Sequence, residues 1–179
     1  MSINDNGIME ALKENPQNGF RMLMAKYQES VYWHIRRLVV SHDDAQDASQ
    51  ETFVKIYRSF GNYRGDCSLR SWIYRIATNE ALRIISKRRQ EVVSIESEAT
   101  GVNLIQGDNY IDFDDKVAVK LQKAILLLPP KQQLAFNLRY YEELGFDEIA
   151  KIADSTPTSI KASYHVAKEK IIKYMNSND

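Results

Sequence analysis

Three polar side chains recur at steps of four residues in the first half of the chain: Arg75, Asn79 and Arg83. Residues four apart lie on the same side of an α-helix, so they are expected to form one row of hydrogen-bond donors. Guanidinium groups bind phosphates, asparagine reads base edges, and the nearby Tyr63 and Tyr74 could stack on unpaired bases. The row predicts a surface for single-stranded nucleic acid. The alternative is a solvated basic face with both tyrosines in the core.

A second group of side chains is acidic and precedes this row. Its members share one helix face, opposite the apolar Phe53 and Ile56; they are Asp43, Asp44, Asp47, Gln50 and Glu51. Val54 is apolar on the same outward side, which favours a docking face for a partner over a solvated first turn. A carboxylate metal site in a helical bundle needs Glu-x-x-His pairs, which the three histidines do not supply. Neither a metal nor a cofactor is therefore predicted.

A third group lies near the C-terminus, where a short helix, a tight turn and a longer helix form a helix-turn-helix pattern. The expected contacts between the two helices are Ile149, Ile152, Ala153, Ile160 and Tyr164. The expected outer face carries Thr158, Lys161, Ala162, His165 and Lys168. Small and polar side chains at a helix N-terminus can reach base edges, and lysines can reach phosphates. An ordinary helical hairpin with a solvated lysine face explains the pattern equally well.

Helical apolar spacing runs through most of the chain and would position these groups. Apolar residues recur at steps of three and four within residues 20–38, 45–60, 69–84, 117–128 and 160–174. Ser41, Ser68 and Thr156 are expected N-caps, and Pro130 and Pro157 are expected in the first turn of their helices. Two glycines and several turn formers make residues 61–67 a loop.

Charge divides the chain into segments although the whole is neutral. The 179 residues carry 24 basic and 24 acidic side chains, but residues 20–90 carry 13 bases against seven acids. Residues 91–116 lose the helical spacing and carry one base against seven acids. The sequence therefore predicts an all-α fold with two helical domains, residues 8–90 and 117–175, joined by an acidic flexible linker over 91–116. The asymmetry favours a nucleic-acid partner.

Several classes of protein are excluded by what the sequence lacks. Its single cysteine, Cys67, cannot form an intramolecular disulfide or a multi-cysteine zinc site, and suits a reducing cytoplasm. The polar N-terminus does not predict a secretory signal, and no apolar run is long enough to insert in a membrane. No nucleophile–base pair and no phosphate loop is present, so the chain is not expected to be an enzyme.

Several motifs in order resemble bacterial RNA polymerase sigma factors of the extracytoplasmic-function (ECF) group. The run from Asp44 to Phe53 is similar to the family's core-polymerase-binding motif, and residues 71–79 resemble the following helix, which reads the −10 promoter element. Residues 126–136 and 146–150 resemble the entry to the domain that reads the −35 element. The resemblance covers about residues 8–175 and implies a protein that joins core RNA polymerase and directs initiation at promoters.

The resemblance also implies roles for individual residues. Contacts with the clamp helices of the largest polymerase subunit would come from Asp47, Gln50, Glu51 and Val54. A flipped −10 base would be held by the loop Arg64, Gly65, Asp66, Cys67 and Ser68, and the separated strand by Arg75, Asn79 and Arg83. The −35 contacts would come from Thr158, Ser159, Lys161, Ala162, His165 and Lys168. The polymerase flap and an anti-sigma factor are further implied partners.

The chain departs from the family pattern in its last two helices. Ser163 and Val166 stand where the family commonly has arginines, and Asp154 replaces a frequent glycine in the turn. One alternative function is a sigma-like module that binds an anti-sigma protein without recognising promoters; its basic face at 75–89 would then tolerate loss of charge. Another is a free-standing helix-turn-helix regulator, but such proteins usually dimerise, and the sequence offers no spare dimerisation helix.

Overall fold

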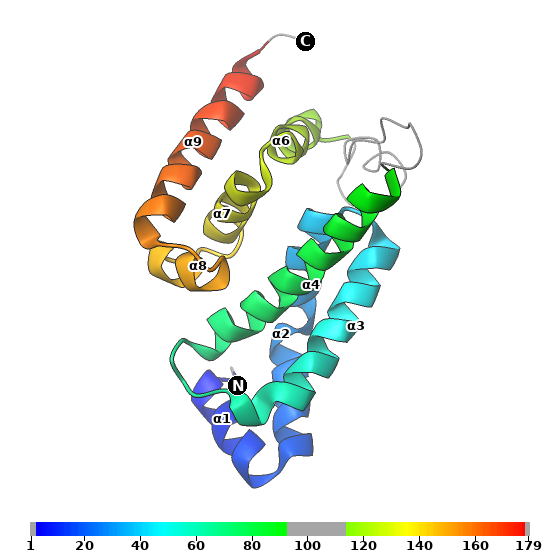
Figure 1. Ribbon diagram of the computed structural model, residues 1–179, viewed down its shortest axis with the longest axis vertical. Helices are drawn as coiled ribbons and strands as arrows, with labels where there is room; N and C mark the ends of the chain where they lie inside the picture. Colours follow the sequence, from blue (N-terminus) through cyan, green and yellow to red (C-terminus); the bar gives the residue numbers. More distant parts are fainter. Residues whose placement is uncertain (1–2, 93–113, 178–179) are drawn as a thin grey trace.

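The computed structural model describes residues 3–92 and 114–177, and the described residues form helices and no strand (Figure 1). The first domain contains α1 (Asp5–Glu14), α2 (Pro16–Val39), α3 (His42–Ser59), the 3₁₀ helix η1 (Phe60–Asn62) and α4 (Leu69–Val92). The second contains α6 (Lys116–Leu126), α7 (Pro130–Tyr140), α8 (Phe146–Ile152) and α9 (Pro157–Asn176). The predicted all-α class is confirmed. Most of the predicted linker lies outside the described residues, and α4 continues to Val92, beyond the linker's predicted start.

The expected caps are in place where the helices begin. The Oγ of Ser41 accepts a hydrogen bond from the amide of Asp44 at 3.4 Å, and the Oγ of Ser68 accepts one from the amide of Ser71 at 3.1 Å. Thr156 accepts from the amide of Ser159 at 3.2 Å, with proline in the following helical position. These side chains satisfy amides that have no partner within the helix, so they fix where α3, α4 and α9 start.

One helix was not predicted from the sequence. α1 crosses α2 at Gly19, where an added Cβ would lie 2.3 Å from the backbone nitrogen of Leu12. The two backbones can approach this closely only because Gly19 has no side chain. Asp5 of α1 accepts hydrogen bonds at 2.7 Å from both Lys26 and the hydroxyl of Tyr27 on α2. These contacts and the buried Ile8 and Leu12 attach α1 to the first domain.

The three long helices α2, α3 and α4 pack together around a core that includes Leu23, Val31, Ile35, Ile56 and Ile73. In the second domain, α6 and α7 pack on α9 around a smaller core that includes Ile125, Phe136 and Ile171. The larger core also contains Leu138 of α7 and Ile149 of α8, so buried apolar contacts continue from one domain into the other. Figure 1 shows the second domain lying beside α4, with α8 nearest to it.

Candidate nucleic-acid and polymerase surfaces

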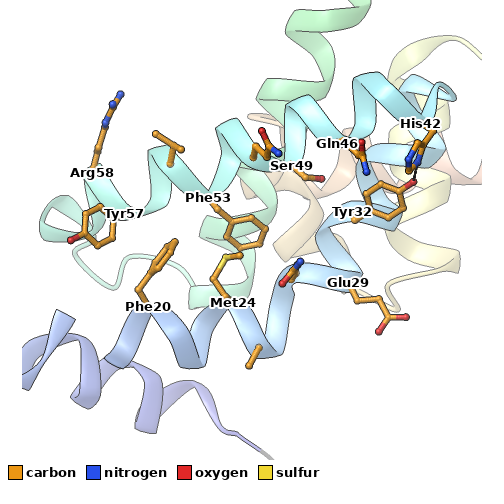
Figure 2. A pocket seen from close by; sticks show the side chains of 14 residues that line it. Phe20, Met24, Glu29, Tyr32, His42, Gln46, Ser49, Phe53, Tyr57 and Arg58 are labelled. Carbon is orange, nitrogen blue, oxygen red and sulfur yellow. Dashed lines mark hydrogen bonds between the residues drawn. The ribbon is translucent and has the colours of Figure 1, made fainter. Parts of the chain in front are cut away.

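An apolar groove runs between α2 and α3 on the surface of the first domain. Phe20 and Met24 of α2 face Phe53 and Tyr57 of α3 across it (Figure 2). The rings of Phe20 and Tyr57 meet edge to face with their centroids 5.2 Å apart. Polar side chains border this apolar floor; they are Gln28, Glu29, His42, Gln46, Ser49, Gln50 and Arg58. An apolar floor with a polar border is the composition of a protein-docking site.

The structure divides the predicted acidic face into two parts. Gln50 and Val54 line the groove, and the side chain of Val54 is 39% exposed there. Asp44, on another side of α3, forms an ion pair with Arg88 of α4. Asp47 and Glu51 follow Asp44 at steps of three and four, so they lie on the side of α3 nearer α4, outside the groove lining. The predicted docking residues are therefore adjacent, but only two of them face the apolar floor.

The predicted row on α4 is exposed. Arg75, Asn79 and Arg83 are all exposed along one side of the helix, as their spacing predicts. Arg83 pairs with Glu80 through its Nη2 at 3.0 Å, and Glu80 also pairs with Lys55 of α3. Arg83 remains 61% exposed, so it can pair with Glu80 and still reach a phosphate. The row therefore offers two guanidinium groups and one amide to solvent.

The loop before α4 is organised by an aromatic pair. The hydroxyl of Tyr63 donates a 2.5 Å hydrogen bond to the carbonyl of Cys67, and its ring packs against Trp72 with centroids 5.2 Å apart. Gly65, with a φ of 79°, adopts a left-handed conformation that favours glycine. The five predicted residues of this loop, 64–68, are exposed or half-buried and connect directly to the start of α4. The exposed residues of the loop and of the row therefore lie in one segment of the first domain, from Arg64 to Arg83.

Tyr74 is not one of these exposed residues. Its side chain is 1% exposed, and burial together with Glu142 raises the pKa of its hydroxyl. The expectation that Tyr74 could stack on an unpaired base is wrong, because its ring lies inside the protein, 5.0 Å from the ring of His34. His34 is buried too, with Nε2 2.8 Å from the hydroxyl of Thr78, and burial lowers its pKa to about 3, with a further contribution from Arg37.

The predicted outer face of α9 is largely exposed. Thr158, Lys161, Ala162, His165 and Lys168 are exposed, whereas Ser159 is half-buried and accepts a 2.7 Å hydrogen bond from Lys131. The predicted inner residues Ile149, Ile152 and Ile160 are at most 2% exposed, while Ala153 and Tyr164 are partly buried. Asp154 in the turn has a φ of 50°, the left-handed conformation for which glycine is suited.

The sequence did not predict a set of contacts that join the two domains. Glu142, after α7, accepts a 2.7 Å hydrogen bond from Tyr74 and pairs with Arg37 of α2 at 3.1 Å. Arg70 of α4 donates to the backbone carbonyl of Glu142 at 2.7 Å. No periodic pattern identifies such a residue, because its partners are 68 to 105 positions away. Only the place of Glu142 in a break between helices could have drawn attention to it.

The described residues contain no group of three or more histidine, cysteine or acidic side chains placed to hold a metal ion. Within residues 3–92 and 114–177, no helix is long and apolar enough to cross a membrane.

Two protein-family models match successive parts of the chain: sigma-70 region 2 over residues 23–91 and sigma-70 region 4 over residues 118–171. The RNA polymerase sigma-H factor of Pseudomonas aeruginosa is 29% identical over 178 residues, covering 94% of this chain and 92% of the relative. The ECF RNA polymerase sigma-E factor of Escherichia coli K12 is 28% identical over 178 residues, covering 94% and 93%.

Two solved structures share the fold. One is the sigma factor RpoE in complex with the anti-sigma factor NepR from Bartonella quintana, with a TM-score of 0.70 at 22% identity, covering 89% of this chain and 98% of that one. The other is CnrH in complex with the cytosolic domain of CnrY, with a TM-score of 0.71 at 15% identity, covering 98% and 99%. At these identities the likeness concerns the arrangement of the helices.

Proposed function

This chain is an extracytoplasmic-function sigma factor that directs RNA polymerase to promoters, and on that premise we propose which surface performs each step. The observation that carries the proposal is the exposure of the row Arg75, Asn79 and Arg83 on the helix that follows the loop 64–68. The row lies in region 2, whereas the exposed face of α9 lies in region 4. Each domain thus supplies one candidate DNA surface.

The groove between α2 and α3 is the proposed docking site for core polymerase. Phe20, Met24 and Phe53 would receive apolar side chains of the largest subunit's clamp helices, with Gln50 and Val54 at the border. Burying apolar side chains here would favour binding, because it removes apolar surface from water. Asp47 and Glu51, beside the groove, would act on orientation and association rate through their charge.

The row on α4 is the proposed surface for the opened −10 strand. Arg75 and Arg83 would pair with phosphates, and Asn79 can read a base edge with its amide. Arg64, Gly65, Asp66, Cys67 and Ser68 would form the rim that holds an unstacked base. Extracting that base costs a few kcal/mol, roughly, which a shaped loop with cationic neighbours can offset.

The outer face of α9 is the proposed −35 surface. Lys161 and Lys168 would reach phosphates, and Thr158, Ala162 and His165 would face base edges from the N-terminal half of the helix. Ser159 is already bonded to Lys131, so it would contact DNA only with that lysine beside it. The polymerase flap is the proposed partner of the rest of region 4.

The proposed setting is cytoplasmic, with core polymerase, promoter DNA and an anti-sigma factor as partners, and without catalysis or a cofactor of its own. The alternative function is a sigma-like module that binds an anti-sigma protein without recognising promoters. One structural neighbour is in complex with the anti-sigma factor NepR and the other with the cytosolic domain of CnrY, but such complexes do not favour that alternative, because the RpoE protein among them is itself a sigma factor.

Transcription reconstituted from purified core polymerase tests the assignment. Run-off synthesis on genomic fragments should depend on this chain. Asn79→Ala should reduce permanganate reactivity of thymines in the opened −10 region while binding to core stays normal. Asn6→Ala, which removes an exposed amide from α1, is the matched control and should leave both unchanged. Unchanged reactivity in Asn79→Ala would contradict the −10 assignment.

A further inference from the structure

A buried carboxylate lies between α3 and α4, beside the exposed row of the proposed −10 surface. Glu80 of α4 is only 2% exposed. A glutamate is almost never buried to this extent unless it is paired, because its charge loses the water that stabilises it. α3 and α4 pack side by side (Figure 1), and the two cations that pair with Glu80 come one from each helix.

The two cations bind different oxygens of the carboxylate. The ammonium of Lys55 on α3 contacts Oε1 of Glu80, while Nε and Nη2 of Arg83 lie 3.1 Å and 3.0 Å from Oε2. Lys55 thus fixes the carboxylate from the neighbouring helix, and the carboxylate in turn holds one edge of the Arg83 guanidinium. Within the part of the chain that the structure describes, these contacts leave Nη1 of Arg83 for a partner.

The pairing of Glu80 with Arg83 has more effect on geometry than on stability. The side chain of Arg83 is 61% exposed, and ion pairs that are open to water contribute little to folding because solvent screens them. An arginine side chain has several rotatable bonds, so one that is already held loses less conformational freedom when it binds a partner. A guanidinium held through Nε and Nη2 can still donate from Nη1 to a phosphate.

We propose that Glu80 is a positioning residue for the −10 strand: anchored by Lys55, it holds the guanidinium of Arg83 in place to bind a phosphate. The proposal rests on the proposed function of the α4 surface. The charge of Glu80 by itself repels a phosphate, so Glu80 can assist binding only through Arg83. Its charge and its positioning role therefore act on DNA binding in opposite directions, and an experiment can separate them.

The test is a double-mutant cycle in the full-length chain with Glu80→Gln, Arg83→Gln and the double variant. Glutamine keeps the shape of the glutamate and removes its charge. Fluorescence anisotropy with labelled oligothymidine measures the affinity at several salt concentrations, because a contact with the phosphate backbone does not depend on the base. Any general effect of removing the acidic charge appears in both Arg83 backgrounds and cancels in the cycle.

Glu80→Gln should weaken oligothymidine binding roughly threefold when Arg83 is present, because a long side chain must then be ordered during binding. In the Arg83→Gln background the same change should not weaken binding, since no guanidinium is left to position. Arg83→Gln should also lower the slope of log affinity against log salt by about 0.7, whereas Glu80→Gln should not lower it. The same factor in both backgrounds, whether a gain or a loss, would overturn the positioning role.

Glu10→Gln is the matched control, because it removes the charge of an exposed acid on α1 in the same domain. It should bind oligothymidine no more weakly than the wild type. Arg83→Lys is the second variant if Glu80→Gln fails to fold, since position 83 is exposed and a lysine keeps the charge without the fork of two nitrogens. It should lose affinity by a similar factor with an unchanged salt slope, and wild-type affinity would contradict the proposal.

Failure of the positioning role and failure of the proposed function give different results. If Arg83→Gln weakens binding while Glu80→Gln has the same effect with and without Arg83, Glu80 has no positioning role and the −10 surface stands. If Arg83→Gln binds oligothymidine as well as the wild type, the −10 assignment of Arg83 is wrong, and the positioning role of Glu80 is wrong with it.

Discussion

The hydroxyl of Tyr74 lies 2.7 Å from Oε2 of Glu142, joining the N-terminal part of α4 to the segment between α7 and α8 across 68 positions of sequence. Because burial and the carboxylate raise the pKa of this hydroxyl, it keeps its proton and donates to Glu142. Tyr74 therefore takes part in the contact between the domains, whereas Asn79, five residues further along α4, is exposed.

A double-mutant cycle should detect coupling between Arg37 and Glu142. Arg37→Gln and Glu142→Gln each remove one partner of a largely buried pair, so the free energies of unfolding should be non-additive by about 1–2 kcal/mol. Urea denaturation of the wild type, both single variants and the double variant measures this. The same cycle with Arg83→Gln in place of Arg37→Gln should be additive, since Arg83 pairs with Glu80 instead.

Acid should destabilise the first domain through His34. Its pKa is lowered to about 3 in the folded chain, while the unfolded chain has the ordinary value near 6.5, so between these values the unfolded state binds more protons. The stabilisation is present above about pH 6.5 and is lost as pH falls, by roughly 2 kcal/mol at pH 5. His34→Gln should reduce this pH dependence, and the exposed His165→Gln should retain it. Equal dependence in both variants would contradict the prediction.

Gly19→Ala should destabilise the packing of α1 on α2. The added methyl would lie 2.3 Å from the backbone nitrogen of Leu12, and a backbone cannot move aside as a flexible side chain can. The cost is expected to be about 1–3 kcal/mol, partly offset by the better helix propensity of alanine. Gly61→Ala is the control, because no atom lies within 4 Å of its added methyl. Thermal unfolding followed by circular dichroism should separate the two variants.

Val54→Glu should weaken binding to core polymerase without unfolding the chain. Val54 is 39% exposed at the groove, so a carboxylate there remains solvated in the free protein but would lose water in the complex. The dissociation constant should rise by roughly tenfold or more in competition binding, which corresponds to about 1.4 kcal/mol. Leu82→Glu, at a similarly exposed apolar position of α4 outside the groove, should bind core normally. Normal binding by Val54→Glu would exclude the groove as the docking site.

Local chemistry makes the helices of this protein predictable. Ser41, Ser68 and Thr156 satisfy amides within the next three residues, and apolar steps of three and four select the buried side of each helix. Those interactions join residues that are close in sequence, so the order of the helices, the helix-turn-helix and the exposed row on α4 can be predicted from the sequence. α1 is the exception, because its place on α2 depends on a close approach at Gly19.

Only the tertiary structure decided how these surfaces are used by the free chain. The sequence could not show that Asp44 forms an ion pair while Gln50 lines the groove, because the partner of Asp44, Arg88, comes from another helix. Tyr74 is an aromatic residue of the type that stacks on bases, but packing buries it against His34 and Glu142. The contacts of Glu142 join residues up to 105 positions apart, and no periodic signal encodes such a distance. Sequence determined which side of each helix is polar, and packing between the domains determined which polar groups remain open to a partner.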